Sequence, residues 1–176
     1  MRVQDHVVLS TIAAVALYPV LRRKVVVPWA ASLLIDVDHY AWYTFAHGSL
    51  NPLEAVRYFN QAQPEQRAGT RSLHSPAALA TLAAGGLVWK PLRLVLYGFL
   101  FHVGIDLFHA QRSARARRLT LERDQHTCRR CGRADETVVA HIWRQPKVLP
   151  SYRLEHLVSL CGPCHEVAHA RRLKFD

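Results

Sequence analysis

The segment LCGPCHEVAH, residues 160–169, decides how the C-terminal third of the chain folds. It contains one C-x2-C pair, Cys161 and Cys164, and an earlier pair, Cys128 and Cys131, precedes it with 29 residues between the two. Four thiolates in two such pairs suit one closed tetrahedral zinc site better than scattered disulfides. The sequence therefore predicts a structural Zn²⁺ bound by all four cysteines.

Two histidines of the same segment, His165 and His169, lie outside this cysteine set. Residues i and i+4 share one face of a helix, so both imidazoles can reach a second, catalytic divalent cation. The helix is expected over residues 163–173, and a strand is expected upstream over residues 137–143. In the alternative interpretation, one histidine replaces a cysteine at the zinc or lies unpaired on the surface.

Positive charge is concentrated towards the C-terminal end. The net charge is +10, and residues 111–176 carry fourteen Lys/Arg against seven Asp/Glu, whereas residues 1–110 carry nine against six. A basic surface beside metal sites favours a polyanionic partner, with DNA first and anionic membrane lipid second. A solvated basic surface without a partner is the alternative. Nothing in the sequence indicates the oligomeric state.

Apolar runs dominate the first part of the chain. They have no charged residue, are rich in Ala, Leu and Val, and cover residues 7–21, 25–35, 76–89 and 94–105. Each run is shorter than the roughly 20 residues that span a bilayer comfortably. The pattern favours a four-helix bundle associated with a membrane, and a cytoplasmic protein is the alternative.

The expected fold class is mostly α with a small α+β zinc domain. We expect a helical domain over residues 1–110, a basic linker over residues 111–118 (QRSARARR), and the zinc domain over residues 119–176. Basic residues next to a membrane helix favour the cytoplasmic side, which predicts a cytoplasmic zinc domain. The LRRK loop at residues 21–24 favours the opposite orientation, so the topology stays open.

The order of residues in the zinc domain is C-x2-C, then VVAHIW with His141, then LEHLVSLC with His156, then CGPCHEVAH. Over residues 117–173 this order resembles the HNH endonuclease family. The resemblance implies a ββα-metal fold that holds a divalent cation (Mg²⁺, Mn²⁺, Ni²⁺ or Zn²⁺) against the scissile phosphate of DNA.

The resemblance also implies a role for each residue. His141 corresponds to the general base, His165 and His169 to ligands of the catalytic ion, and His156 to the asparagine that braces the loop carrying the base. A neutral imidazole can accept a proton near pH 7, which fits the base. Three arginines beside the first cysteine pair are expected to contact the DNA backbone: Arg129, Arg130 and Arg133.

Two positions differ from the family pattern. His156 replaces the middle asparagine, and Ala140 stands where many members carry an Asp or His that completes the metal shell. Because alanine cannot bind a metal ion, the alternative is a zinc-stapled nucleic-acid-binding module that does not cleave.

The helical half carries ionisable residues that an apolar bundle does not need. Their order resembles that of membrane-bound, predicted metal-dependent hydrolases, although Ile35 replaces the usual proline. The resemblance implies one or two metal ions bound by His6, Asp36, Asp38, His74, His102 and Asp106. In this alternative function, the helical half hydrolyses a phosphoester such as a phospholipid. In the structural interpretation, DVDH (residues 36–39) only ends a helix, with Asp38 and His39 solvated.

Overall fold

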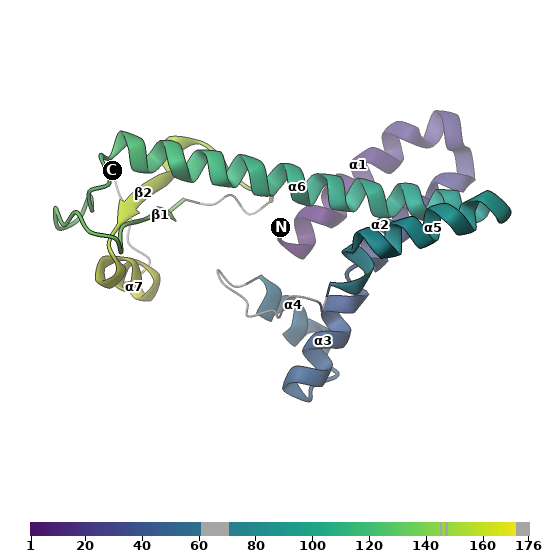
Figure 1. The fold of residues 1–176 in the computed structure, drawn as a ribbon, viewed down its shortest axis with the longest axis horizontal. Coiled ribbons are helices and arrows are strands. Elements are labelled where there is room, and N and C mark those ends of the chain that lie inside the picture. Colours follow the sequence, from purple (N-terminus) through teal and green to yellow (C-terminus); the bar gives the residue numbers. More distant parts are fainter. Residues whose placement is uncertain (61–70, 145, 147, 172–176) are drawn as a thin grey trace. The chain divides into compact units, whose positions relative to one another are not determined.

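The computed structural model describes residues 1–60, 71–144, 146 and 148–171 (Figure 1). The chain is mostly helical and has one two-stranded antiparallel sheet, which confirms the expected fold class at this level. It divides into two compact units, Met1–Asp106 and Leu107–Asp176, called here the N-terminal unit and the C-terminal unit.

The four predicted apolar helices form. They are α1 (Val3–Leu21), α2 (Val26–Leu34), α5 (Pro76–Val88) and α6 (Pro91–Arg123). A 3₁₀ turn, η1 (Arg22–Val25), follows α1, and a second one, η2 (Ser72–His74), precedes α5. Ser75 caps α5 by accepting a hydrogen bond from the Ala78 N–H, and Pro76 occupies the first turn, where its missing N–H costs nothing. An apolar core of Ala31, Ile35 and Phe99 joins α2 and α6.

Two further helices, α3 (Val37–His47) and α4 (Pro52–Phe59), were not expected. They carry aromatic and charged side chains instead of a continuous apolar run, so they lack the signal that identified the other helices. Asn51 caps α4 through the Leu53 N–H, again with a proline in the first turn. α3 places DVDH at its start and not, as the structural interpretation required, only at the end of a preceding helix.

Gly98 on α6 lies where α2 comes closest. A Cβ added at Gly98 would lie 2.3 Å from the Pro28 carbonyl oxygen and 2.8 Å from the Ala31 Cβ. Backbone cannot yield to such a contact as a flexible side chain can. Only glycine therefore permits this helix packing.

Gly98→Ala is expected to destabilise the N-terminal unit by about 1–3 kcal/mol, the usual range for overpacking. Gly104→Ala is the matched control on the same helix, because a Cβ there meets nothing within 4 Å. Alanine is the better helix former, so this control should be neutral or slightly stabilising. Thermal unfolding in detergent measures both, and equal melting temperatures for the two variants would contradict the packing argument.

Two helical stretches, Val3–His47 and Pro91–Arg123, are long and apolar enough to cross a membrane. A buried core helix can pass the same test, so length and composition alone support membrane association only weakly.

The segment predicted to be a basic linker, residues 111–118, is helical and lies inside α6. Alanine and arginine are both strong helix formers, so a run of them continues a helix readily. The boundary between the two units, after Asp106, likewise falls within α6 and not at residue 111.

The C-terminal unit contains a small sheet between two helices. Strand β1 (Val139–Ile142) pairs antiparallel with β2 (Leu157–Leu160), so that Ala140 lies opposite Ser159 and His141 opposite Val158. Helix α7 (Gly162–Arg171) follows β2. The strand predicted over residues 137–143 and the helix predicted over 163–173 match β1 and α7, although residues 172 and 173 lie outside the described ones.

Successive strand residues point to opposite faces of a sheet, and β1 follows this rule. Ala140 is buried in a core cluster with Ala116 of α6 and Leu157 of β2. On the other face, Val158 packs in a cluster with Cys164 and Ala168 of α7. One face of β1 therefore meets α6, and the other meets α7.

Asp124 fixes the end of α6 to strand β2. Its carboxylate accepts hydrogen bonds from Arg123 at 2.8 and 2.9 Å and from the Ser159 backbone N–H at 3.0 Å. Burial alone would raise the pKa of Asp124, but these hydrogen bonds outweigh burial and hold the pKa below its usual value. A lowered pKa in the folded state stabilises the fold above the unfolded pKa, and this contribution is lost as the pH falls through the lowered value.

Asp124→Asn is expected to lower the free energy of unfolding of the C-terminal unit by about 1.5–3 kcal/mol, the range for hydrogen bonds to a charged group. Glu122→Gln, in an exposed ion pair with Arg118, should change it by less than about 1 kcal/mol. Brief proteolysis of the C-terminal unit across a series of urea concentrations compares the two. Equal losses would show that Asp124 has no special structural role.

Candidate metal centres

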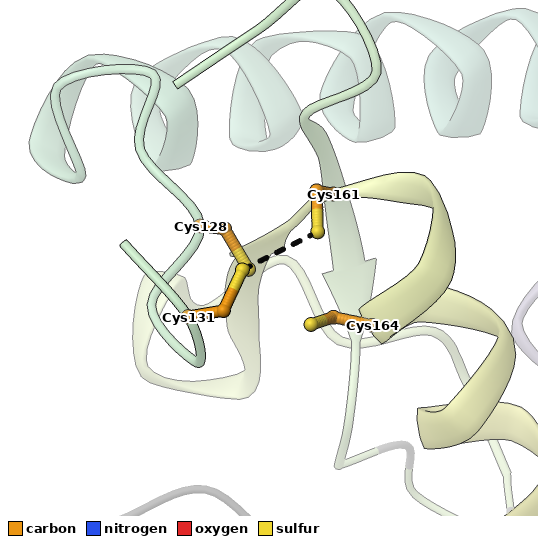
Figure 2. A group of neighbouring side chains, drawn as sticks. All are labelled: Cys128, Cys131, Cys161 and Cys164. Atoms are coloured by element: carbon orange, nitrogen blue, oxygen red, sulfur yellow. Dashed lines mark hydrogen bonds between the residues drawn. The ribbon is translucent and has the colours of Figure 1, made fainter. Parts of the chain in front are cut away.

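The four cysteines come together although their two pairs lie 29 residues apart (Figure 2). Cys128 and Cys131 flank a tight turn, which Gly132 closes with a positive φ of 75° and a hydrogen bond to the Cys128 carbonyl. Cys161 directly follows β2, and Cys164 lies in the first turn of α7. The Sγ atoms of Cys131 and Cys161 are 3.6 Å apart, well beyond a disulfide bond. The four-cysteine cluster is positioned to bind a metal ion such as zinc.

The thiols of this cluster differ in their pKa values. Although burial opposes ionisation, hydrogen bonds from backbone N–H groups outweigh it and lower the pKa of Cys128 to about 6. Burial, followed by the neighbouring thiols, raises the pKa of Cys164 to about 12. Without a cation, the thiolate is therefore favoured at Cys128 and disfavoured at Cys164, whereas a bound cation would deprotonate the thiols that bind it.

A second group of potential ligands, called here the three-histidine cluster, consists of His141, His165 and His169. Its candidate ligand nitrogens all lie within 4.8 Å of one another. The ring centroids are 4.6 to 4.9 Å apart, and each pair of rings is close to perpendicular. β1 supplies His141, and α7 supplies the other two with the i, i+4 spacing expected from the sequence.

The neutral form is favoured for two of the three imidazoles. Burial, followed by electrostatic repulsion from His165, His169 and Arg117, lowers the pKa of His141 to about 4. Burial and the neighbouring His169 also lower the pKa of His165. Neutral imidazoles offer a nitrogen lone pair, which is the form that binds a metal ion or accepts a proton.

The other residues expected in this half lie outside the three-histidine cluster. His156 is buried in a 3₁₀ turn, η3 (Leu154–His156), where its Nδ1 lies 2.6 Å from the Ser151 Oγ and its carbonyl accepts from the Trp143 N–H. These hydrogen bonds stabilise the connection between β1 and β2. The catalytic role expected of His156 stays a prediction. The three arginines expected to contact DNA are exposed around the cysteine turn: Arg129, Arg130 and Arg133.

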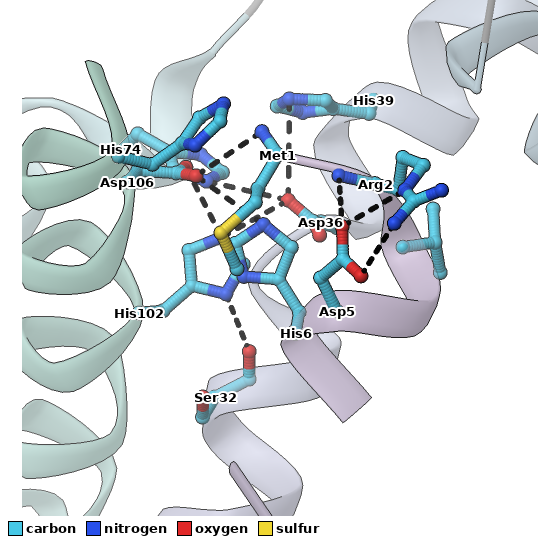
Figure 3. Close-up of polar contacts among 12 residues, drawn as sticks. Met1, Arg2, Asp5, His6, Ser32, Asp36, His39, His74, His102 and Asp106 are labelled. Atoms are coloured by element: carbon cyan, nitrogen blue, oxygen red, sulfur yellow. Dashed lines mark hydrogen bonds and ion pairs between the residues drawn. The ribbon is translucent and has the colours of Figure 1, made fainter. Parts of the chain in front are cut away.

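The N-terminal unit holds a larger polar cluster (Figure 3). It combines residues from α1, the α2–α3 junction, α3, η2 and α6, namely His6, Asp36, His39, His74, His102 and Asp106. Overlapping sets of three could each hold a metal ion: His6 with Asp36 and His102, Asp36 with His39 and His74, and His74 with His102 and Asp106. Figure 3 shows these side chains converging on one region.

His102 is held in one tautomer. Its ring is fully buried, and its Nδ1 lies 2.7 Å from the Ser32 carbonyl oxygen, which only accepts, so Nδ1 carries the proton. Nε2 is then the nitrogen that can take up a second proton or bind a cation; it lies 3.4 Å from Asp36 and 3.5 Å from Asp106, and makes no hydrogen bond. A lone pair facing two carboxylates is unfavourable unless a proton or a cation lies between them. Metal-bound histidines in proteins show the same arrangement of the two ring nitrogens.

His74 repeats this arrangement. Its Nδ1 lies 3.3 Å from Asp38, while its buried Nε2 lies 3.4 Å from Asp36 and makes no hydrogen bond. His39 is similar, because its Nδ1 lies 2.5 Å from Asp38 and its Nε2 3.9 Å from Asp36. Asp38 thus orients two imidazoles, and both turn their other nitrogen towards Asp36.

This geometry separates residues that the sequence grouped together. Asp38 was expected among the ligands, but among the described residues it belongs to none of the sets that could share one ion. His39 belongs to such a set, although the predicted ligands did not include it. The signal was present in DVDH, where the histidine directly follows the second aspartate. The suggestion that Asp38 is solvated is wrong, because this residue is buried.

No protein family, curated protein or solved structure matches this chain.

Proposed function

We propose that the C-terminal unit is a metal-dependent endonuclease of the HNH type, which hydrolyses phosphodiester bonds in DNA. The observation that carries the proposal is the combination, in one small ββα unit, of a four-cysteine cluster with a separate three-histidine cluster. A binding module needs only the first, because a structural zinc suffices to hold such a fold together.

The chemistry follows from the residues available. Water attacks phosphorus and forms a new P–O bond, the ester P–O bond breaks, one proton leaves the water, and the leaving oxygen gains a proton from solvent. His165 and His169 would hold a divalent cation, which supplies Lewis-acid stabilisation of the phosphate charge. His141 reaches the same place, either as acceptor of the water's proton or as a third ligand. Exposed arginines around the cysteine turn would bind the DNA backbone.

The test is nicking of supercoiled plasmid by the full chain in detergent, with its zinc retained and Mg²⁺, Mn²⁺, Ni²⁺, Co²⁺ or Zn²⁺ added. We expect metal-dependent nicking that His165→Asn reduces by at least about 100-fold, as for loss of a group acting on the transition state. His126→Asn is the control, a histidine of the same unit outside the cluster. Its backbone φ of 53° is one that asparagine tolerates.

Salt-sensitive DNA binding without nicking under any of these metals would contradict the nuclease and identify a nucleic-acid-binding module. Nicking that survives His165→Asn would mean that the activity does not come from this cluster.

A second function is favoured by the buried, unbonded imidazole nitrogens of the N-terminal unit. We propose that this unit binds one or two transition-metal ions and hydrolyses a phosphoester at a membrane. Its imidazole and carboxylate ligands suit zinc, manganese or iron. His74→Asn, but not His165→Asn, should abolish hydrolysis of a phospholipid presented in vesicles. The two apolar helical stretches favour a membrane-associated chain. The basic residues 111–118 would favour a cytoplasmic C-terminal unit.

A further inference from the structure

We propose that His141 is the third ligand of the ion in the three-histidine cluster and not its general base, which makes this an all-imidazole site selective for borderline transition metals. The inference deepens the proposed nuclease, since it concerns the same cluster. It names the class of cation and reassigns one residue.

Residues 140 and 141 lie on opposite faces of β1. The pattern of the HNH family expects a ligand at position 140 and the base at position 141. Here Ala140 is buried against Ala116 and Leu157, on the face of β1 that meets α6. His141 lies on the opposite face, in ring contact with both histidines of α7. Position 141 is therefore the one that β1 contributes to the cluster.

The geometry of the three rings suits a shared ion. They are mutually near perpendicular, at 85°, 90° and 90°, with their potential ligand nitrogens within 4.8 Å. Zinc–nitrogen distances of about 2.0–2.1 Å would require only a modest contraction of the cluster.

All potential ligands in the cluster are imidazoles. No Asp or Glu among the described residues shares the cluster, so three imidazole nitrogens face the ion. Mg²⁺ and Ca²⁺ require oxygen ligands, whereas imidazole suits Zn²⁺, Ni²⁺, Co²⁺ and Cu²⁺. Three protein ligands also leave one position of a tetrahedral ion open to solvent or to a phosphate oxygen.

The two roles of His141 exclude each other at a single nitrogen. A lone pair that binds the ion cannot also accept the proton of the attacking water. Loss of nicking in a His141 variant does not separate the roles, but metal binding does.

The experiment uses the full chain in detergent with one zinc equivalent kept in the four-cysteine cluster, and Co²⁺ is titrated while its visible absorption is recorded. His141→Asn is expected to weaken binding of this Co²⁺ by at least about tenfold, as His165→Asn does, while His126→Asn leaves it unchanged. Ions held by the N-terminal unit are common to all variants and cancel in the comparison. Retention of the zinc equivalent reports that the C-terminal unit is folded.

His141→Cys provides a second readout. With all native cysteines occupied by zinc, a sulfur-to-cobalt charge-transfer band in the near ultraviolet arises only if residue 141 binds the Co²⁺. The band supports the proposal, and Co²⁺ binding without it overturns the proposal. Wild-type affinity in His141→Asn, or nicking supported by Mg²⁺ alone, would also overturn it.

The outcomes distinguish this inference from the proposed nuclease. Co²⁺ binding that depends on His141, without nicking under any metal, supports the ligand and refutes the endonuclease. Nicking that is lost in His141→Asn while Co²⁺ binding persists supports the endonuclease with His141 as its base, and refutes the ligand.

Discussion

Replacing Cys161 with serine is expected to unfold the C-terminal unit. Cys161 is buried directly after β2, and its sulfur would be one of four zinc ligands. Structural zinc contributes about 10–16 kcal/mol of apparent binding free energy in zinc-finger peptides, more than the whole stability of a small unit. The expected result is loss of zinc by mass spectrometry and rapid proteolysis of residues 107–176 in detergent, with the N-terminal helices still protected.

Cys131→Ser is the matched variant. Cys131 is exposed, so its replacement removes a ligand without leaving a gap in the core. If zinc maintains the fold, both variants and a chelator-treated wild type should be digested alike. An intact, protease-resistant C-terminal unit in Cys131→Ser would mean that packing, and not metal binding, explains the effect at Cys161.

In the N-terminal unit, Asp36→Asn is expected to weaken Zn²⁺ or Mn²⁺ binding far more than Asp38→Asn. Asp36 faces the unbonded nitrogens of His74 and His102 and belongs to two of the three possible ligand sets. Asp38 instead orients His39 and His74 through their Nδ1 atoms. Loss of such a partner typically reduces metal affinity about 10–100-fold. Loss of Asp36 should exceed that range.

Isothermal titration of the full chain in detergent, with its cysteine-bound zinc in place, measures both affinities. Asp135→Asn is the control, since this exposed carboxylate lies in the other unit. Equal losses at positions 36 and 38 would show that both carboxylates ligate, as the sequence resemblance implied. Wild-type affinity in Asp36→Asn would argue against a metal site in this unit.

The sequence predicted the elements whose signals are local. Two C-x2-C pairs and an i, i+4 histidine pair bring their ligands together through short turns and one helix, so their spacing alone was informative. Continuous apolar runs identified four helices for the same reason. The short helices α3 and α4 were not predicted, because the stability of each depends more on contacts with the rest of its unit than on its own composition.

The sequence could not predict which residues of each site bind a metal ion and which residues orient those ligands. Asp36 and Asp38 are the same residue type two positions apart, and only their distances to His74 and His102 separate a ligand from an orienting group. His102 donates to the carbonyl of Ser32, a backbone group that no side-chain pattern identifies. Likewise, strand alternation predicts that residues 140 and 141 face opposite sides, but not which side holds the histidines of α7.

The burial of Ala140 bears on how this chain could acquire the ligand that its family resemblance leads one to expect. Ala140→Asp would place a carboxylate in the core beside Ala116 and Leu157, where an unpaired charge is strongly unfavourable. A designer who restores the family pattern in this way would lose the fold and gain no ligand. A carboxylate at position 140 would first require a different packing between α6 and the sheet. The packing around Ala140 therefore excludes a metal ligand at this position.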